Sequence, residues 1–282
     1  MSDTRRKSRN RLGLRFHQTF IPERHYLSSL LRFAAAGGTG SNIEISEKTG
    51  IPTGKSSGKV PAILQYAQGM NLVFAEGKLP GRRIRPTPWG EAVLAHDPAL
   101  GHAFTQWMAH LHLCRRQGGA EIWFRTFGPG SDALGKEFQR ETLDRYLTGL
   151  FGPAKRSLIG PMKGTYQESA ALQKAGALAA DGETFLRVPA PLEPAFAHGY
   201  AAFLLSLWDR HFPEDRQATL SDFEEETFWG RIHGWDEGQR KQALGMMAEK
   251  GALLIDKQME PWVLTRQASA ADFHSLLYSE ID

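Results

Sequence analysis

The sequence has very little cysteine and no long apolar run. Its single cysteine, Cys114, excludes an internal disulfide framework and a cysteine-rich zinc site. No apolar stretch approaches the roughly 18 residues that a membrane-spanning helix needs. The basic N-terminus is not followed by an apolar segment, so a signal peptide is not expected. These absences predict a cytoplasmic protein that makes no membrane contact.

Compact catalytic motifs are also missing. None of the ten histidines belongs to an H-E-x-x-H pattern or to another compact zinc pattern, and there is no G-x-S-x-G elbow. The segment Gly54-Lys55-Ser56 follows no strand and does not complete a P-loop, which argues against an NTPase. The helically spaced carboxylates Glu137, Glu141 and Asp144 are typical of a solvated helix face. The sequence therefore leaves any metal ligands unknown.

The 282 residues carry a net charge of only +3, but this charge is distributed unevenly. Residues 1–24 have a net charge of +5, residues 25–208 have another +5, and residues 209–282 have −7. A polyanion would be attracted to the first two segments and repelled by the last one. Double-stranded DNA is therefore the expected partner of the N-terminal half. The alternative is a basic arm followed by ordinary solvated faces.

The N-terminal third has the element order of a winged helix-turn-helix. Residues 1–13 are polar and basic and are expected to form a disordered arm. The expected elements then follow in the order of a helix near 26–33, a short helix at 43–52, a longer helix at 56–70 and a basic hairpin at 72–85. In a winged helix the longer helix faces the major groove and the hairpin contacts the phosphate backbone. The predicted domain spans 14–90.

A helix end, a glycine and a strand-starting leucine occur three times. The copies lie at 63–72, 171–178 and 243–253, and hairpin candidates follow at 72–85, 178–188 and 253–264. Glycine suits such a helix end because it adopts the left-handed conformation without steric cost. We therefore predict a mainly α (α+β) chain of tandem winged-helix-like modules. The boundaries expected after the first module are a helical connector at 91–130, a second module at 131–190 and an acidic C-terminal module at 191–282.

Basic and hydroxyl side chains mark the predicted DNA contacts. Free N–H groups, hydroxyls and lysines at the start of a helix suit a phosphate, and basic hairpins commonly contact phosphates. The predicted contacts are Arg5, Arg6, Arg9 and Arg11 in the arm, Lys55, Ser56, Ser57 and Lys59 at the helix start, Arg82, Arg83 and Arg85 in the hairpin, and Lys155, Arg156 and Lys163 in the second module. The third module, acidic and rich in tryptophan, suggests a protein-contact or dimer surface. A tryptophan-rich core is the alternative there.

One short segment beside the basic arm has an unusual composition. In Phe16-His17-Gln18-Thr19-Phe20 a histidine and a threonine lie between two aromatic residues. His17 could act there as a general acid or base on a scissile phosphate. A buried, hydrogen-bonded structural histidine is the alternative.

Together these segments resemble a bacterial family, the SspB-type proteins. Residues 16–20 resemble the family's G-H-E-T-F signature, with Gln18 in place of the usual acid. Residues 54–60 resemble its G-K-N-M-V-like helix start, with Ser57 near the usual Asn or Met. The resemblance continues through Thr87-Pro88-Trp89-Gly90, with the following Asp97-Pro98, and through 107–112. It covers most of the chain in the same order.

The resemblance implies a role in DNA phosphorothioation within an anti-phage defence system. A member of this family would nick one DNA strand so that sulfur can replace a non-bridging oxygen, with Mg²⁺ or Mn²⁺ as the expected metal and no organic cofactor. The implied partners are a cysteine desulfurase, an ATPase and an ATP-pyrophosphatase-like sulfur enzyme, and a homodimer is expected. Two alternatives stay open, a non-catalytic DNA-binding adaptor of the sulfur-transfer complex and a winged-helix transcriptional regulator.

Overall fold

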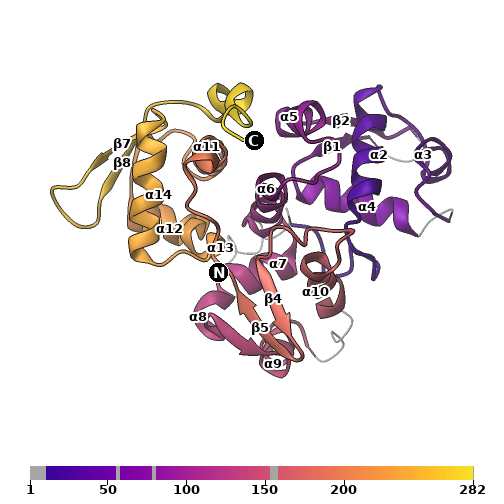
Figure 1. Cartoon of the computed structure of the whole chain (residues 1–282), viewed down its shortest axis with the longest axis horizontal. Coiled ribbons are helices and arrows are strands. Elements are labelled where there is room, and N and C mark those ends of the chain that lie inside the picture. The colour runs from indigo at the N-terminus through magenta and orange to yellow at the C-terminus, as the bar shows by residue number, and fades with distance from the viewer. Residues whose placement is uncertain (1–10, 55–57, 78–80, 153–157, 282) are drawn as a thin grey trace.

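The computed structural model describes residues 11–54, 58–77, 81–152 and 158–281. The chain is mainly α-helical with three small antiparallel sheets, as the sequence predicts. Three groups of elements surround the central helices α6 and α7 (Figure 1). None of the helices in the described ranges has the length and apolarity to cross a bilayer.

The first group carries a helical layer on a two-stranded hairpin. Its elements are α2 (Arg24–Ala35), α3 (Asn42–Thr49), α4 (Lys59–Gly69), β1 (Val73–Glu76) and β2 (Arg83–Pro86). Helix α2 forms because Leu27, Leu30, Leu31 and Ala34 recur at helical spacing, and all four are buried. Helix α3 begins at a Ser41 capping box and ends at Gly50, whose φ of 72° is left-handed.

A helical segment follows, in the region predicted as a connector. Its helices are α5 (Pro88–His96), α6 (Ala103–Cys114), α7 (Glu121–Phe127) and α8 (Gly130–Leu134). The Thr87 hydroxyl accepts the Gly90 N–H at 2.9 Å and so caps α5. A Cβ on Gly90 would lie 1.9 Å from the Leu72 carbonyl oxygen, so only glycine lets α5 approach the hairpin this closely.

The second and third groups share one sheet topology. The second contains β3 (Glu137–Gln139), α9 (Arg140–Phe151), α10 (Ile159–Gln167), β4 (Leu178–Asp181) and β5 (Thr184–Arg187). The third contains η3 (Pro194–Phe196), α11 (Ala197–His211), β6 (Gln217–Thr219), α12 (Leu220–Thr227), α13 (Trp229–His233), α14 (Glu237–Glu249), β7 (Leu253–Asp256), β8 (Val263–Arg266) and η4 (Ala270–Leu276). The strand orders, β3-β5-β4 and β6-β8-β7, place the earliest strand against the last one in both sheets.

In the first group a short segment pairs with the hairpin in the way that β3 and β6 do in the other two groups. Thr39 forms an isolated antiparallel bridge with Arg83, and the Ile84 N–H donates to the Gly38 carbonyl at 2.8 Å. Each of the three groups therefore has helices, a hairpin and a short segment that pairs with the hairpin's second strand. The three hairpins lie where the repeated glycine-leucine pattern predicts them.

The N-terminal segment differs from the expected disorder at residues 11–13. The Leu12 N–H donates to the Gly119 carbonyl at 2.8 Å, and Leu12 forms a parallel bridge with Ala120. Arg11 forms an ion pair with Glu121 at 2.5 Å. These bonds fix the segment beside the turn between α6 and α7, because they satisfy backbone groups that an unstructured arm would leave to water.

Candidate nucleic-acid interface

The segment Phe16–Phe20 is a tight turn anchored in the core. The Phe16 ring lies 4.7 Å from Tyr66 and 5.8 Å from Trp123, measured between ring centroids. The Phe20 carbonyl accepts the Tyr66 hydroxyl at 3.0 Å. Gln18 and Thr19 have φ angles of 46° and 72°, a conformation that non-glycine residues rarely adopt. Packing on α4 and α7 holds this strained turn in place.

The same turn contacts the loop that leads into α4. The Gln18 side-chain carbonyl accepts the Gly58 N–H at 2.9 Å. Gly58 has a φ of 125° and forms a bridge with Thr53, and a Cβ at this position would lie 3.0 Å from the Thr53 Cα. The structure thus brings together two motifs that lie 40 residues apart in the sequence. Lys55, Ser56 and Ser57 lie outside the described residues, and α4 begins at Lys59, later than the sequence suggested.

Lys59 is not a free cation at the helix start. Its Nζ forms an ion pair with the Glu23 carboxylate at 2.9 Å and lies 4.8 Å from the centroid of the Tyr26 ring. The side chain is 17% exposed. Its ammonium group therefore fastens α4 to the segment before α2, and only part of it can face a phosphate.

His17 occupies the interior of the turn. Its side chain is nearly completely buried, and its Nδ1 accepts the Thr19 N–H at 3.0 Å. Burial lowers the pKa of His17 to about 4, so the ring is neutral at pH 7. Nε2 is buried and has no hydrogen-bond partner among the described residues. In this geometry the ring supports the turn, and the catalytic role of His17 stays a prediction.

The hairpin β1–β2 carries three arginines at or near its second strand. Arg83 and Arg85 are exposed, and Arg82 is half-buried. Within the described ranges none of these three arginines forms an ion pair. Arg85 lies opposite Phe74 in the strand register, and both side chains are exposed. This outer face of the hairpin is free to contact an anionic partner.

The remaining predicted contacts have different environments. The Lys163 ammonium lies on α10, donates to the Gly182 carbonyl at 3.4 Å and lies 5.9 Å from the Phe185 ring centroid. Arg11 is held by Glu121 and donates to the Arg116 carbonyl at 2.8 Å. The contacts that lie outside the described residues are Arg5, Arg6, Arg9, Lys155 and Arg156.

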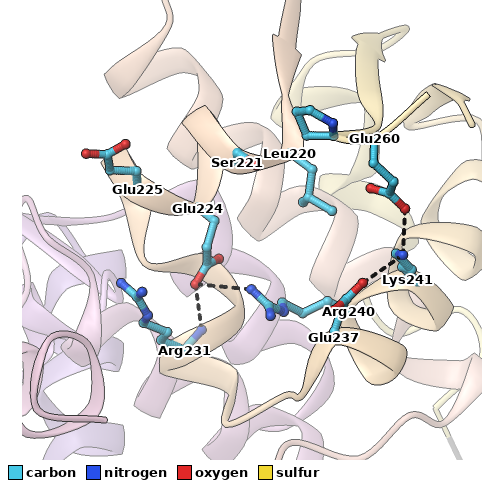
Figure 2. A pocket seen from close by; sticks show the side chains of 10 residues that line it. Leu220, Ser221, Glu224, Glu225, Arg231, Glu237, Arg240, Lys241 and Glu260 are labelled. Carbon is cyan, nitrogen blue, oxygen red and sulfur yellow. Dashed lines mark hydrogen bonds and ion pairs between the residues drawn. The ribbon is translucent and has the colours of Figure 1, made fainter. Parts of the chain in front are cut away.

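The acidic third group contains a cavity of about 540 Å³ between α12, α14 and the following hairpin. Glu224 is buried there and accepts the backbone N–H groups of Gly230 and Arg231 at 2.6 and 3.2 Å. Burial raises the pKa of Glu224. Lys241 forms ion pairs with Glu237 and Glu260 at 2.8 and 2.7 Å (Figure 2). Charges of both signs line this cavity, and its cations already have carboxylate neighbours.

A metal site is not formed within the part of the chain that the structure describes. There, no group of three or more histidine, cysteine, aspartate or glutamate side chains is arranged to hold a metal ion. Glu141, Asp144 and Glu183 line a common cavity, but Glu141 is paired with Arg145 and Glu183 with Arg140. The described residues thus do not provide a protein-only site for Mg²⁺ or Mn²⁺.

Three sheet-bearing groups around a helical centre define a mainly α architecture, and known structures share it. Its fold is that of SspB. A magnesium ion-bound SspB crystal structure matches with a TM-score of 0.76 and 17% identity over 98% of this chain and 90% of that one. A second SspB crystal structure matches with a TM-score of 0.74 and 17% identity over 98% and 91%. No protein-family model matches the chain, and no curated protein does.

These matches confirm, at the level of the fold, the resemblance to SspB-type proteins. Sequence reasoning singled out Gln18 only as a departure from the family signature and did not recognise its contact with Gly58. The positive φ angles of Gln18 and Thr19 carry no sequence signal, because neither residue is glycine. The signal available in the sequence was that both residues belong to segments that resemble the SspB-type family.

Proposed function

We propose that this protein is an SspB-type component of a DNA phosphorothioation system that binds double-stranded DNA and nicks one strand. The observation that carries the proposal is the contact between Gln18 and Gly58. It fixes Gly58, the residue directly before α4, against a core-anchored turn, within a chain that has the SspB fold along almost its full length. Lys55, Ser56 and Ser57 directly precede Gly58 in the sequence, and lysine and hydroxyl side chains before a helix suit a DNA phosphate.

The DNA-binding surface would comprise the loop before α4 and the hairpin that follows it. In the winged-helix interpretation, α4 faces the major groove and the hairpin contacts the backbone. Arg83 and Arg85 support this placement because they are exposed and form no ion pair within the described ranges, where the exposed Glu76 lies opposite Arg83 in the strand register. Each phosphate contact would release counterions, so binding would weaken as salt increases.

The deciding experiment for the nickase is a supercoiled-plasmid assay with the purified full chain. Mg²⁺, Mn²⁺ and EDTA are compared, because the structural neighbour described as magnesium-bound makes Mg²⁺ the first metal to test. Open-circle product that requires a divalent metal supports the nickase. His17→Ala tests whether the histidine takes part in the cleavage, and His25→Ala, a change at an exposed histidine of the same region, is the matched control.

A second candidate function is a non-catalytic adaptor that brings the sulfur-transfer enzymes to DNA. The deep burial of His17 and the missing metal cluster in the described ranges favour it. Plasmid that is shifted in a gel but never cut, under any metal condition, would replace the nickase by the adaptor.

The proposal includes partners that the resemblance implies. These are a cysteine desulfurase, an ATPase, an ATP-pyrophosphatase-like enzyme and a second copy of the chain, all in the cytoplasm. The acidic third group, with its cavity of mixed charge, is the proposed protein-contact surface because its excess of carboxylates would repel DNA. Analytical ultracentrifugation of the chain alone tests the dimer.

A further inference from the structure

One buried arginine has no acidic partner among the residues that the structure describes. Arg115 directly follows α6 and is only 3% exposed. Its Nη1 donates to His112 Nδ1 at 3.1 Å, while its Nε is buried without an acceptor among the described residues. A buried charge without a counter-charge costs several kcal/mol, and proteins normally supply a carboxylate or an anion to offset this cost.

A second arginine lies beside it. Arg210, in the last turn of α11, is exposed, and its Nη1 lies 3.4 Å from the position that a Cβ on Gly118 would occupy. Arg115 Nη2 lies 3.2 Å from the same position. Two guanidinium groups thus converge on one point, where Gly118 leaves space because it has no side chain. Burial and the adjacent Arg210 charge lower the pKa of Arg115 to about 9.

The neighbouring carboxylates are already paired with other cations. Asp209 forms an ion pair with Arg266 at 2.7 Å. Glu226 binds Arg116 and His211, each at 2.9 Å. Within the described ranges neither Arg115 nor Arg210 has an ion pair. This arrangement differs from the cavity in Figure 2, where Lys241 has two carboxylate partners.

The location connects this pair of arginines to the basic N-terminal sequence. Leu12 donates its N–H to the carbonyl of Gly119, next to Gly118, and Arg11 donates to the carbonyl of Arg116. Arg11 and Leu12 therefore lie beside the turn that holds Arg115. Arg11, Arg115 and Arg210 thus bring basic side chains to this turn from three segments that are far apart in the sequence, and Glu121 pairs with Arg11.

We propose that Arg115, Arg210 and the turn at Gly118 form a binding site for a phosphate group. Guanidinium forks match two oxygens of a phosphate, and two such groups of like charge are stabilised together when an anion lies between them. The group could belong to DNA or to free inorganic phosphate. The assignment of the phosphate group to DNA rests on the proposed function. The existence of the phosphate site does not depend on that function.

Titration of the full chain with inorganic phosphate tests the site, by calorimetry and by the thermal midpoint, against chloride at equal ionic strength. We expect saturable phosphate binding that Arg210→Gln weakens at least tenfold, because one of the two guanidinium forks is lost. The control Arg145→Gln removes an exposed arginine that already has its own carboxylate, Glu141, and should bind phosphate as the unmodified chain does. Equal binding by Arg210→Gln and the unmodified chain, or no saturable binding at all, overturns the proposal.

A second variant guards against a misleading loss of folding. Arg115→Met replaces the buried cation by an apolar side chain of similar length, and a correctly folded variant should lose the phosphate-dependent rise in thermal midpoint. If folded Arg115→Met keeps that rise, the site is not where we place it. The circular dichroism spectrum and the midpoint in chloride report whether the variant is folded.

DNA titrations identify the source of the phosphate. If the source is DNA, inorganic phosphate competes with a DNA duplex for the unmodified chain, and Arg210→Gln lowers DNA affinity. If the source is free phosphate, Arg210→Gln loses phosphate binding while DNA affinity is unchanged. Both results support the site. A chain that binds phosphate but no DNA contradicts the proposed function and leaves the site intact.

Discussion

The first and third groups of elements carry the same succession of helices and hairpin but present opposite charge. Helix α4 has Gly58 as its N-cap and no acidic residue in its first turn, whereas α14 has an Asp236 capping box and Glu237 in its first turn. An acidic first turn uses the positive end of the helix dipole for its own carboxylates and repels a phosphate. The first turns of α4 and α14 therefore give two similar groups of elements a different affinity for anions.

The two hairpins differ in the same way. In β1–β2 the exposed Phe74 lies opposite the exposed Arg85. In β7–β8 the exposed Leu254 lies opposite the half-buried Thr265, and Met259 in the connecting loop is 79% exposed. An apolar hairpin suits contact with another protein, and an arginine-bearing one suits contact with phosphates.

The largest effect is expected from reversing charge in the first hairpin. Arg83→Glu with Arg85→Glu should lower DNA affinity about a hundredfold, since two phosphate contacts would become repulsions. Lys257→Glu in the third hairpin is the matched control and should change affinity less than twofold. Gel-shift titrations at one fixed salt concentration measure both. If the changes in the two hairpins lower DNA affinity equally, the first hairpin is not a specific DNA contact.

Acid should destabilise the turn beside α4 by an intermediate amount. Burial lowers the folded-state pKa of His17 from 6.5 to about 4, so its neutral form contributes stability above pH 6.5 that is lost as pH falls toward 4. The loss is on the order of 3 kcal/mol. His17→Gln should flatten the pH dependence of the unfolding free energy in this window, measured by urea denaturation.

The pH result also bears on the third group, where His233 is fully buried and burial lowers its pKa to about 3. His233→Gln should flatten the curve down to a lower pH than His17→Gln does. A His17→Gln variant with the slope of the unmodified chain would show that the turn does not hold its histidine neutral.

The smallest effect is expected at Gln18. Gln18→Ala removes the acceptor of the Gly58 N–H and should cost about 1 kcal/mol of stability, with a severalfold loss of DNA affinity because the loop is no longer fixed. Gln258→Ala, at an exposed position of the third hairpin, is the control and should leave the unfolding free energy unchanged. Urea denaturation and gel shifts measure the two quantities. If folded Gln18→Ala binds DNA as tightly as the unmodified chain, the turn at residues 16–20 does not contribute to the DNA interface.

Local patterns predicted much of this fold. The hairpins expected at 178–188 and 253–264 are the observed β4–β5 and β7–β8, because a left-handed glycine ends the preceding segment and strand residues alternate after it. The sequence analysis did not predict strands β3 and β6, which add a third strand to each of these two hairpins. Each has three residues and pairs with a strand more than 40 residues later, so no local periodicity reveals it.

The candidate sites were less predictable for the same reason. Composition identified the hairpin arginines, whose exposure follows from the alternation of β2. Lys59 was expected to face a phosphate, but its ammonium group forms an ion pair with Glu23, 36 residues earlier in the sequence. The convergence of Arg115 and Arg210 depends on how α6 and α11 pack, and sequence spacing does not encode that packing.

The bond between Gln18 and Gly58 has a consequence for charge balance. An amide and a carboxylate offer the same kind of acceptor oxygen, so either side chain could hold the loop in place. Only the carboxylate would bring a full negative charge next to the backbone that leads into α4. This chain has glutamine where the family signature has an acid. It therefore keeps the hydrogen bond to Gly58 and lacks the negative charge that would repel an incoming anion.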